Sequence, residues 1–294
     1  MTYALVIHGG AGARPGTDYS EQKKHLEVLI NKGQEMLISG HDALEIVTTI
    51  VAEMEASGLY VAGKGSAPNT DGIVELDASV MDGKNQRAGA VAAISNIVHP
   101  IHAAQSVLTD GKHVMLAGNG AKTFALSKGA SLVDDPDNYY TEHVSHGSMG
   151  DTASHGTVGA VALDMNGNLA AATSTGGTFN KRPGRVGDTP LIGAGTWADS
   201  RVAVSGTGIG EAFIRTSAAH DVAARVTYGN ATLDAATRAV LDEIKKCDGN
   251  GGLIAVDRDG HISMPFNSDG MKRAAVSNNM PAVVRVFEAE YTQD

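Results

Sequence analysis

The first sixty positions contain a short apolar run, followed by a longer stretch in which apolar residues recur with the period of an α-helix. Residues 1–10 contain a short apolar run, which we interpret as a buried first strand. From Ser20 to Ser57 the apolar positions follow the helical period, and Gly40 interrupts it. The sequence therefore predicts two helices with a break at this glycine. The residues that carry the helical period are Leu26, Leu29, Ile30, Met36, Leu37, Leu44, Val47 and Ile50.

Strand and helix patterns alternate in the middle of the chain. The spacing predicts strands at 73–81, 88–97 and near 113–116, with helices at 100–109 and 121–128. From 134 to 156 the residues are polar and include Pro136 and three of the eleven histidines. We expect this segment to be an exposed, mobile linker.

Two hairpins follow residue 157. Apolar runs at 160–164 and 169–174 flank an Asn-Gly turn, and runs at 252–257 and 261–266 flank an Asp-Gly turn. Between the hairpins, helices are predicted at 211–226 and 233–246. Two β layers covered by two helical layers make an α+β fold of the αββα sandwich type, which is our prediction for the whole chain.

The composition narrows the class of protein. Hydrophobic residues make up 42% of the 294 positions, enough for a substantial core in one large domain or two smaller ones. No stretch approaches the roughly 20 apolar residues of a membrane span. The net charge is −10 and the basic residues are scattered, so neither nucleic acid nor a membrane is expected as a partner.

Cysteine usage and the N-terminal segment both bear on location. The single cysteine, Cys247, excludes an internal disulfide and is typical of a reducing cytosol. The first residues lack the basic region and the longer apolar run of a signal peptide. We therefore expect a cytoplasmic protein.

The junction between the polar segment and the following strand carries the main chemical signal. Gly156 directly precedes Thr157, which opens an apolar run. A protein that cuts its own backbone at such a junction gains a threonine whose hydroxyl is a nucleophile and whose α-amine is a base. An isolated Gly-Thr pair is more often a loop glycine before an ordinary strand residue. The surrounding motifs favour the catalytic interpretation.

Those motifs occur along nearly the whole chain. In their identity and order they resemble the plant-type asparaginases and isoaspartyl peptidases, a family of N-terminal-nucleophile hydrolases with a threonine nucleophile. The matching segments are Ile7–Gly12, Val74–Gly83, His155–Asp164, Ala171–Gly177, Pro183–Pro190, Ser205–Ile214 and Gly251–Gly270.

The resemblance implies a self-activating hydrolase. Cleavage between Gly156 and Thr157 would divide one domain, residues 1–294, into an α subunit 1–156, with a flexible linker at about 134–156, and a β subunit 157–294. Two such αβ units would form a dimer. The enzyme would hydrolyse the side-chain amide of L-asparagine and β-aspartyl (isoaspartyl) dipeptides, with no cofactor for catalysis.

The family motifs also assign roles to individual residues. Thr157 would be the nucleophile, and an α-amine that titrates near 7.7–8.0 can act as its base once it is free. Thr175 would orient the nucleophile. Thr207 and Gly208 would supply the hydroxyl and backbone N–H of an oxyanion hole and contact the substrate, as would Gly210.

Arg185 and Asp188 form the expected specificity clamp of the family. A guanidinium matches a carboxylate bidentately, and a neighbouring carboxylate can hold an ammonium group. Together they would bind the α-carboxylate and α-amine of an aspartyl group. Without the resemblance, an exposed salt bridge between the two would be the simpler interpretation.

Three alternatives remain at this point. The first is a nucleotide-binding enzyme, because the glycine-rich segments Gly9–Gly12 and Gly206–Gly210 superficially resemble phosphate-binding loops. Neither segment fits the dinucleotide fingerprint. A catalytically weak relative that binds an aspartyl ligand, and a related glycosylasparaginase, are the other two. The intact set of threonines, Arg185 and Asp188 favours the amidohydrolase.

The chain departs from the family pattern at one position near the site. Where relatives carry an asparagine that lines the oxyanion site, this chain has Val61, whose side chain cannot donate a hydrogen bond. Either Thr207 and Gly208 suffice, or Asn69 substitutes. The resemblance further implies a structural Na⁺ bound by the backbone carbonyls of Met54, Glu55, Ser57, Tyr60, Ala62 and Lys64.

Overall fold

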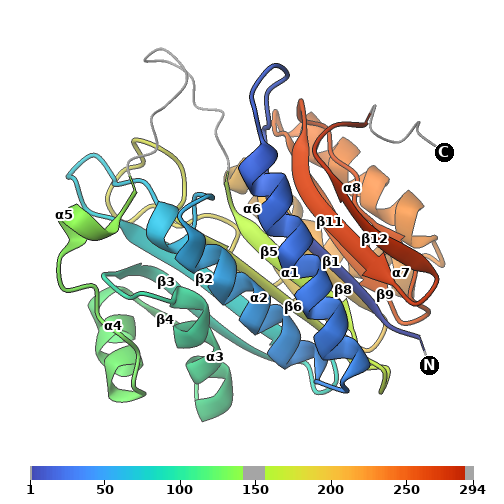
Figure 1. Cartoon of the computed structure of the whole chain (residues 1–294), viewed down its shortest axis with the longest axis horizontal. Coiled ribbons are helices and arrows are strands. Elements are labelled where there is room, and N and C mark those ends of the chain that lie inside the picture. Colours follow the sequence, from blue (N-terminus) through green and yellow to red (C-terminus); the bar gives the residue numbers. More distant parts are fainter. Residues whose placement is uncertain (1, 142–155, 289–294) are drawn as a thin grey trace.

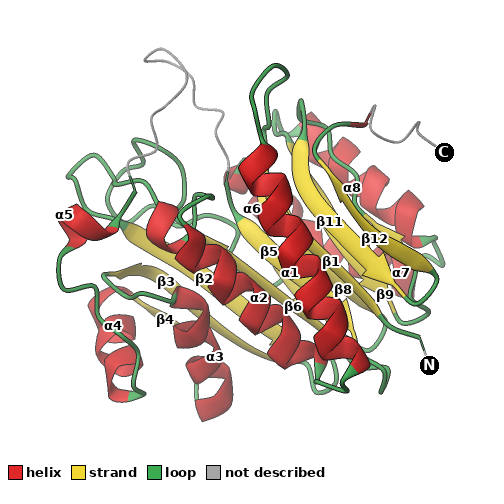
Figure 2. Ribbon diagram, viewed as in Figure 1, coloured by secondary structure: helices red, strands yellow, loops and turns green. Residues whose placement is uncertain are grey.

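The structure is a computed structural model that describes residues 2–141 and 156–288. Helices and strands are mixed, so the predicted α+β class is confirmed (Figures 1 and 2). An eight-stranded sheet has the order β12-β11-β1-β5-β6-β2-β3-β4, in which only the β3–β4 pair is parallel. Its strands are β12 (Met280–Arg285), β11 (Met271–Ser277), β1 (Ala4–Ala11), β5 (Val158–Leu163), β6 (Leu169–Thr175), β2 (Glu75–Asp82), β3 (Arg87–Ser95) and β4 (Met115–Ala117).

A second sheet has four strands, and each sheet has its own helices. The large sheet carries α1 to α4, and the small sheet carries α6 to α8 (Figure 1). The small sheet is β10 (Ile262–Ser263), β9 (Gly251–Asp257), β8 (Val202–Gly208) and β7 (Thr196–Ala198). The helices are α1 (Ser20–Ile38), α2 (Ala43–Ser57), α3 (Pro100–Asp110), α4 (Gly118–Ser127), α6 (Gly210–Thr216), α7 (Ala218–Thr227) and α8 (Leu233–Lys246).

Three buried apolar clusters hold these elements together. One joins the large sheet to α1, α2 and α3, a second joins the small sheet to α6, α7 and α8, and a third lies between the two sheets. Burial of this apolar surface is the main stabilising contribution to the fold. Representative residues of the three clusters, in that order, are Ile50, Phe213 and Val161.

The alternation of side chains along the strands decides what faces the space between the sheets. On β5, Ala160 and Ala162 belong to the cluster under the helices, whereas Val161 and Leu163 belong to the cluster between the sheets. By this period of two, Thr157 faces the other sheet as well. The strand therefore directs the candidate nucleophile into the interior.

The N-terminal helices form as the apolar pattern predicts. Gly40 lies between α1 and α2 with a φ of +86°, a left-handed conformation that favours glycine. The strands predicted at 73–81 and 88–97 and the helices at 100–109 and 121–128 are all present, with ends shifted by up to three residues.

The C-terminal half differs from the prediction in three places. The helix expected at 211–226 is two helices, because Ser217 takes a left-handed conformation with φ of +49° between α6 and α7. The sequence did not predict β7, β8, β11 or β12. The second strand of the late hairpin is only Ile262–Ser263, and after an irregular stretch at Met264 and Pro265 the chain returns to β9 in an isolated bridge between Phe266 and Gly252.

The expected linker is partly ordered. A short helix, α5 (Pro136–Tyr139), begins in it, with the Asp135 side chain accepting from the N–H of Asn138. Thr141 donates its backbone N–H to the carbonyl of Lys64, 3.0 Å away. The segment through residue 141 is thus fixed to the fold, and residues 142–155 of the expected linker lie outside the described residues.

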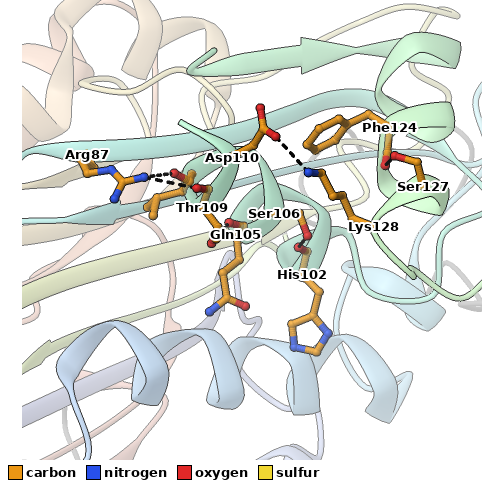
Figure 3. A network of polar contacts seen from close by, with 10 residues as sticks. Arg87, His102, Gln105, Ser106, Thr109, Asp110, Phe124, Ser127 and Lys128 are labelled. Atoms are coloured by element: carbon orange, nitrogen blue, oxygen red, sulfur yellow. Dashed lines mark hydrogen bonds and ion pairs between the residues drawn. The ribbon is translucent and has the colours of Figure 1, made fainter. Parts of the chain in front are cut away.

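Polar contacts fasten the outer edge of the large sheet (Figure 3). Arg87 at the start of β3 donates to the carbonyl of Leu108 at 2.6 Å, and Lys128 after α4 pairs with Asp110 at 2.9 Å. The ammonium of Lys128 also lies 5.3 Å from the ring centroid of Phe124. Exposed ion pairs contribute little free energy, so these contacts orient the edge of the sheet more than they stabilise the fold.

In the part of the chain that the structure describes, no helix is both long and apolar enough to cross a membrane.

Candidate active site

Thr157 and Thr175 meet at the ends of two paired strands. The register of β5 and β6 places Val158 opposite Ser174, so the residues next to them are neighbours. The hydroxyl of Thr157 donates to the hydroxyl oxygen of Thr175 over 3.0 Å, and Thr175 also accepts from the N–H of Gly177 at 3.0 Å. Thr157 is only 7% exposed. A buried threonine held by a second hydroxyl has a defined side-chain direction, as a nucleophile requires.

Thr207 comes to the same end of the interior from the small sheet. It lies near the end of β8 and is 1% exposed, and its hydroxyl oxygen accepts from the N–H of Ala11 at the end of β1 over 3.2 Å. The next residue, Gly208, has a φ of +155°, and a Cβ there would lie 2.3 Å from the carbonyl oxygen of Asn250. Only glycine fits at this last residue of β8, directly after Thr207.

Arg185, Asp188 and Gly210 are brought together in space. A Cβ added to Gly210 would lie 2.9 Å from both Nη2 of Arg185 and Oδ1 of Asp188. These three of the five predicted substrate-binding residues are therefore neighbours. Because Gly210 has no side chain, the guanidinium and the carboxylate can both approach its backbone closely.

The electrostatics of Asp188 favour a cationic ligand. The side chain is 6% exposed, and its Oδ2 atom has no hydrogen-bond partner among the described residues. Burial raises the pKa of Asp188 to about 7, with smaller upward contributions from Asp77 and Glu211 and a downward one from Arg185. A buried carboxylate oxygen without a partner is costly, and an ammonium group would satisfy it.

Sequence reasoning missed Glu211, which pairs with Arg185. The guanidinium donates from Nε and Nη2 to the two carboxylate oxygens of Glu211, each at 3.0 Å. This bidentate pair fixes the plane of the guanidinium beside Asp188. The position of Glu211 directly after Gly210 is the signal that could have identified it.

Two further buried charges, Asp77 and Lys181, hold the loop that carries the clamp. Asp77 accepts from the N–H of Ala93 at 2.8 Å and of Gly187 at 3.3 Å. Lys181 is 5% exposed and donates to the carbonyl of Gly176 at 2.7 Å. Burial raises the pKa of Asp77 and lowers that of Lys181, while the attraction between them opposes both shifts. The pair links the clamp loop to the end of β6.

The departure at Val61 places an apolar side chain beside the predicted cleavage site. A Cβ on Gly156 would lie 2.4 Å from Cγ2 of Val61, so the residue before Thr157 must be glycine here. Asn69 holds its own turn instead: its Oδ1 accepts from two backbone N–H groups and its Nδ2 donates to Glu75 at 2.9 Å. Nothing in these contacts supports Asn69 as a substitute for the missing asparagine.

The carbonyls named for a sodium ion lie in the last turn of α2 and in the segment that follows it. Four of them accept hydrogen bonds from the protein, namely those of Met54, Tyr60, Ala62 and Lys64. The carbonyl of Lys64 accepts from both the N–H and the hydroxyl of Thr141, at 3.0 and 3.2 Å, so both of its lone pairs are engaged. The donor set is of the hard oxygen type that suits such an ion.

Comparison with known proteins identifies the family. The sequence model of the family described as Asparaginase matches residues 1–285. An isoaspartyl peptidase of Salmonella typhimurium is 46% identical over 92% of this chain and 94% of its own length, and one of Escherichia coli is 44% identical over 92% and 91%. A probable isoaspartyl peptidase/L-asparaginase 2 of Arabidopsis thaliana is 35% identical over 97% and 99%. The chain belongs to this asparaginase family.

Proposed function

We propose that this chain is a hydrolase that cuts itself between Gly156 and Thr157 and then cleaves the side-chain amide of L-asparagine and the β-aspartyl bond of isoaspartyl dipeptides. The observation that carries the proposal is the 3.0 Å contact between the hydroxyls of Thr157 and Thr175 at the start of a buried strand. Relatives that match more than nine-tenths of the chain bear the names isoaspartyl peptidase and L-asparaginase, which supports the substrate class.

Self-cleavage is the first step. The hydroxyl oxygen of Thr157 attacks the carbonyl carbon of Gly156, the peptide C–N bond breaks, and an ester joins the two residues. Water then hydrolyses the ester, which leaves a carboxylate on Gly156 and a free α-amine on Thr157. The products are an α subunit of residues 1–156 and a β subunit of residues 157–294.

The freed amine makes Thr157 a catalyst for other substrates. A neutral α-amine accepts the hydroxyl proton as the oxygen attacks the side-chain carbonyl of the substrate. Thr175 orients the attacking oxygen, and Thr207 with the backbone N–H of Gly208 stabilises the negative charge that develops on the carbonyl oxygen. Ammonia or an amino acid leaves, and water releases aspartate from Thr157.

Arg185 and Asp188 select the aspartyl group. Arg185 binds the α-carboxylate, and the partnerless Oδ2 of Asp188 binds the α-ammonium beside Gly210. This arrangement suits a small molecule that carries both charges on one carbon. The leaving group is not held by the clamp, so both asparagine and β-aspartyl dipeptides fit it.

The architecture and assembly are further parts of the proposal. The three apolar clusters, one between the sheets and one under each set of helices, support an αββα sandwich of the N-terminal-nucleophile hydrolase type in a single domain of residues 1–294. Two αβ units associate as a dimer, which light scattering on the purified enzyme would test. Catalysis needs no cofactor.

A structural sodium ion is the last part of the proposal. The carbonyls of Met54, Glu55, Ser57, Tyr60, Ala62 and Lys64 would hold it, and its role would be to fix the segment next to Val61. Binding adds stability to the folded state alone. The thermal midpoint should therefore be higher in sodium chloride than in choline chloride at equal ionic strength.

The decisive experiment follows both steps in one preparation. On a denaturing gel and by intact mass, the purified protein should resolve into two chains, the second with Thr157 at its N-terminus. The Thr157→Ala variant should stay at full length and release no ammonia from L-asparagine. A wild-type protein that stays intact yet is fully active would contradict the mechanism, and one that binds aspartate without turnover would indicate a binding protein.

A further inference from the structure

A row of buried polar groups crosses between the two sheets next to Thr157. Ser79 on β2 contacts Thr196 on β7 at 2.7 Å, Thr196 contacts Thr173 on β6 at 2.6 Å, and Thr173 contacts Ser205 on β8 at 2.8 Å. The hydroxyl of Ser205 then lies 3.0 Å from Nε2 of His8 on β1. All five side chains are fully buried. We call Ser79, Thr196, Thr173 and Ser205 the hydroxyl chain.

The part of the hydroxyl chain next to the clamp has a defined direction. Ser79 donates to Thr196, while sharing its proton with the carbonyl of Thr189 at 2.6 Å, and Thr196 donates to Thr173. Between Thr173 and Ser205 either hydroxyl can be the donor, and the hydroxyl of Thr173 also lies 3.4 Å from the carbonyl oxygen of Gly195.

His8 ends the hydroxyl chain as a neutral ring, because burial, aided by the charge of Lys272, lowers the pKa of His8 to about 3. The tautomer of the ring decides whether Nε2 or the hydroxyl of Ser205 donates in their 3.0 Å contact. The sequence alone identifies His8 only as a hydrogen-bonded core histidine, and the structure adds this contact.

His8 and Ser205 pack against the strand that follows the nucleophile. His8 pairs with Gly159 in the register of β1 and β5, and Gly159 lies two residues after Thr157. The ring and Ser205 can reach this place only because residue 159 is glycine: a Cβ there would lie 2.4 Å from Nε2 of His8 and 2.1 Å from the hydroxyl of Ser205.

The other end of the hydroxyl chain is attached to the clamp. Thr189, whose carbonyl accepts from Ser79, directly follows Asp188. Gly195 donates its N–H to the carbonyl of Asp188 at 3.1 Å and accepts from the N–H of Gly206 at 2.9 Å. The loop that binds the substrate and the strand that carries the nucleophile are thus joined through one set of buried hydrogen bonds.

We propose that the hydroxyl chain and His8 are positioning residues for the hydrolysis: through the packing of His8 and Ser205 on Gly159, they hold the strand that follows Thr157 at a fixed place relative to the clamp. The inference rests on the proposed function. None of these side chains needs to touch the substrate. Small errors in the placement of reacting groups cost rate, so the effect falls on kcat.

The test removes one hydroxyl from the middle of the chain without changing shape. Thr173→Val is nearly isosteric and breaks the row, whereas Thr173→Ser keeps the hydroxyl and loses the methyl group. Thr237→Val is the matched control, because Thr237 on α8 is also fully buried and its hydroxyl lies 2.8 Å from that of Ser263, away from the site.

For each variant, kcat and KM are measured per mole of cleaved protein, together with the thermal midpoint. Thr173→Val should lower kcat by about tenfold with KM within about twofold, Thr173→Ser should recover most of kcat, and Thr237→Val should keep kcat at the wild-type value. Equal kcat in Thr173→Val and wild type, or in Thr173→Val and Thr173→Ser, would overturn the proposal.

A second measurement does not depend on activity. Nitrogen-15 NMR of histidine-labelled Thr157→Ala protein reports on the imidazole rings, and a His8→Gln variant assigns the signal of His8. One tautomer of His8 is expected, and its signal should shift or become mixed when Thr173→Val is added but not when Thr237→Val is added. A His8 signal that is unchanged by Thr173→Val would contradict the inference. A wild-type enzyme that hydrolyses neither substrate would refute the proposed function while this signal could still be read.

Discussion

The space between the two sheets has an apolar end and a polar end, and the same strands build both. On β5, Val161 and Leu163 lie in the apolar cluster, and Thr157 lies at the other end of the same face. On β6, Leu169 belongs to the apolar cluster, and Thr173 belongs to the hydroxyl chain. On both strands, every second side chain faces the space between the sheets. The same face therefore contributes to the apolar core at one end and to the candidate site at the other, and only the residue type changes along the strand.

The two ends contribute different things to the protein. Burial of the apolar end adds free energy of folding in proportion to its area. At the polar end the buried hydroxyls satisfy one another, so their net contribution to stability is small, but each atom is held in a defined place. Substitutions should therefore separate stability from activity according to the end in which they fall.

The largest effect on activity is expected at the contact of Thr157 and Thr175, the two candidate catalytic threonines. Thr175→Val keeps the shape but removes the partner of the Thr157 hydroxyl and the acceptor of the Gly177 N–H. We expect kcat/KM per mole of cleaved protein to fall by about 100-fold, the cost of losing one preorganised hydrogen bond in an active site. Retention of most of the activity would show that Thr157 is oriented by another group.

The largest effect on stability is expected at the apolar end. Leu163→Ala, at a position 1% exposed, should lower the free energy of unfolding by about 2–5 kcal/mol and leave kcat unchanged in the folded enzyme. Urea unfolding in a Thr157→Ala background keeps the chain in one piece for this measurement. Leu126→Ala at a site 39% exposed is the control and should change stability much less.

The clamp should show a smaller effect, limited to the substrate. Arg185→Ala removes a charge-assisted contact to the α-carboxylate, so kcat/KM should fall at least about tenfold for both asparagine and a β-aspartyl dipeptide. Self-cleavage should continue, because it involves no free substrate. Arg238→Ala, which breaks an exposed ion pair with Asp234, is the control. Unchanged kinetics in the Arg185→Ala variant would show that Arg185 does not bind the substrate.

The smallest effect is a change with pH. Burial raises the pKa of Asp188 to about 7, so the carboxyl group is protonated below that pH and cannot bind the substrate ammonium as a charge. In the free enzyme, protonation of Asp188 should therefore lower kcat/KM by up to about tenfold per unit below pH 7, in addition to the fall caused by protonation of the Thr157 α-amine. In the complex the ammonium stabilises the carboxylate, so the contribution of Asp188 to the fall in kcat should appear only at lower pH. Superimposable profiles of kcat and kcat/KM would contradict this assignment.

The elements that local patterns predict are those with a single buried face. The helices α1 and α2 follow the apolar period, and Gly40 separates them as expected. The strand β11 was missed because it carries Lys272 and Arg273, although Arg273 is 1% exposed and lies 4.7 Å from the ring centroid of Phe266. From the sequence alone a charged side chain is expected to be exposed, because the contact with a ring that stabilises it in the interior is not visible there.

The residues of the candidate site likewise differ in whether local sequence patterns reveal them. The motifs identified Thr157, Arg185 and Asp188, and the structure brings the last two together beside Gly210. Glu211, in the first turn of α6, was missed because its partner Arg185 lies 26 positions earlier, in a loop. The pairing itself depends on how this loop is placed against the helix, and only the position of Glu211 next to Gly210 gave a local signal.

The sequence by itself determined which side chains share a face of each strand, where the glycines permit tight turns, and where Thr157 follows a glycine. These properties depend on neighbours a few positions apart. Only the tertiary structure decided that Ser205 would meet His8, 197 positions away, over a glycine of a third strand. That meeting depends on how one sheet stacks on the other, and stacking is set by the packing of the whole core.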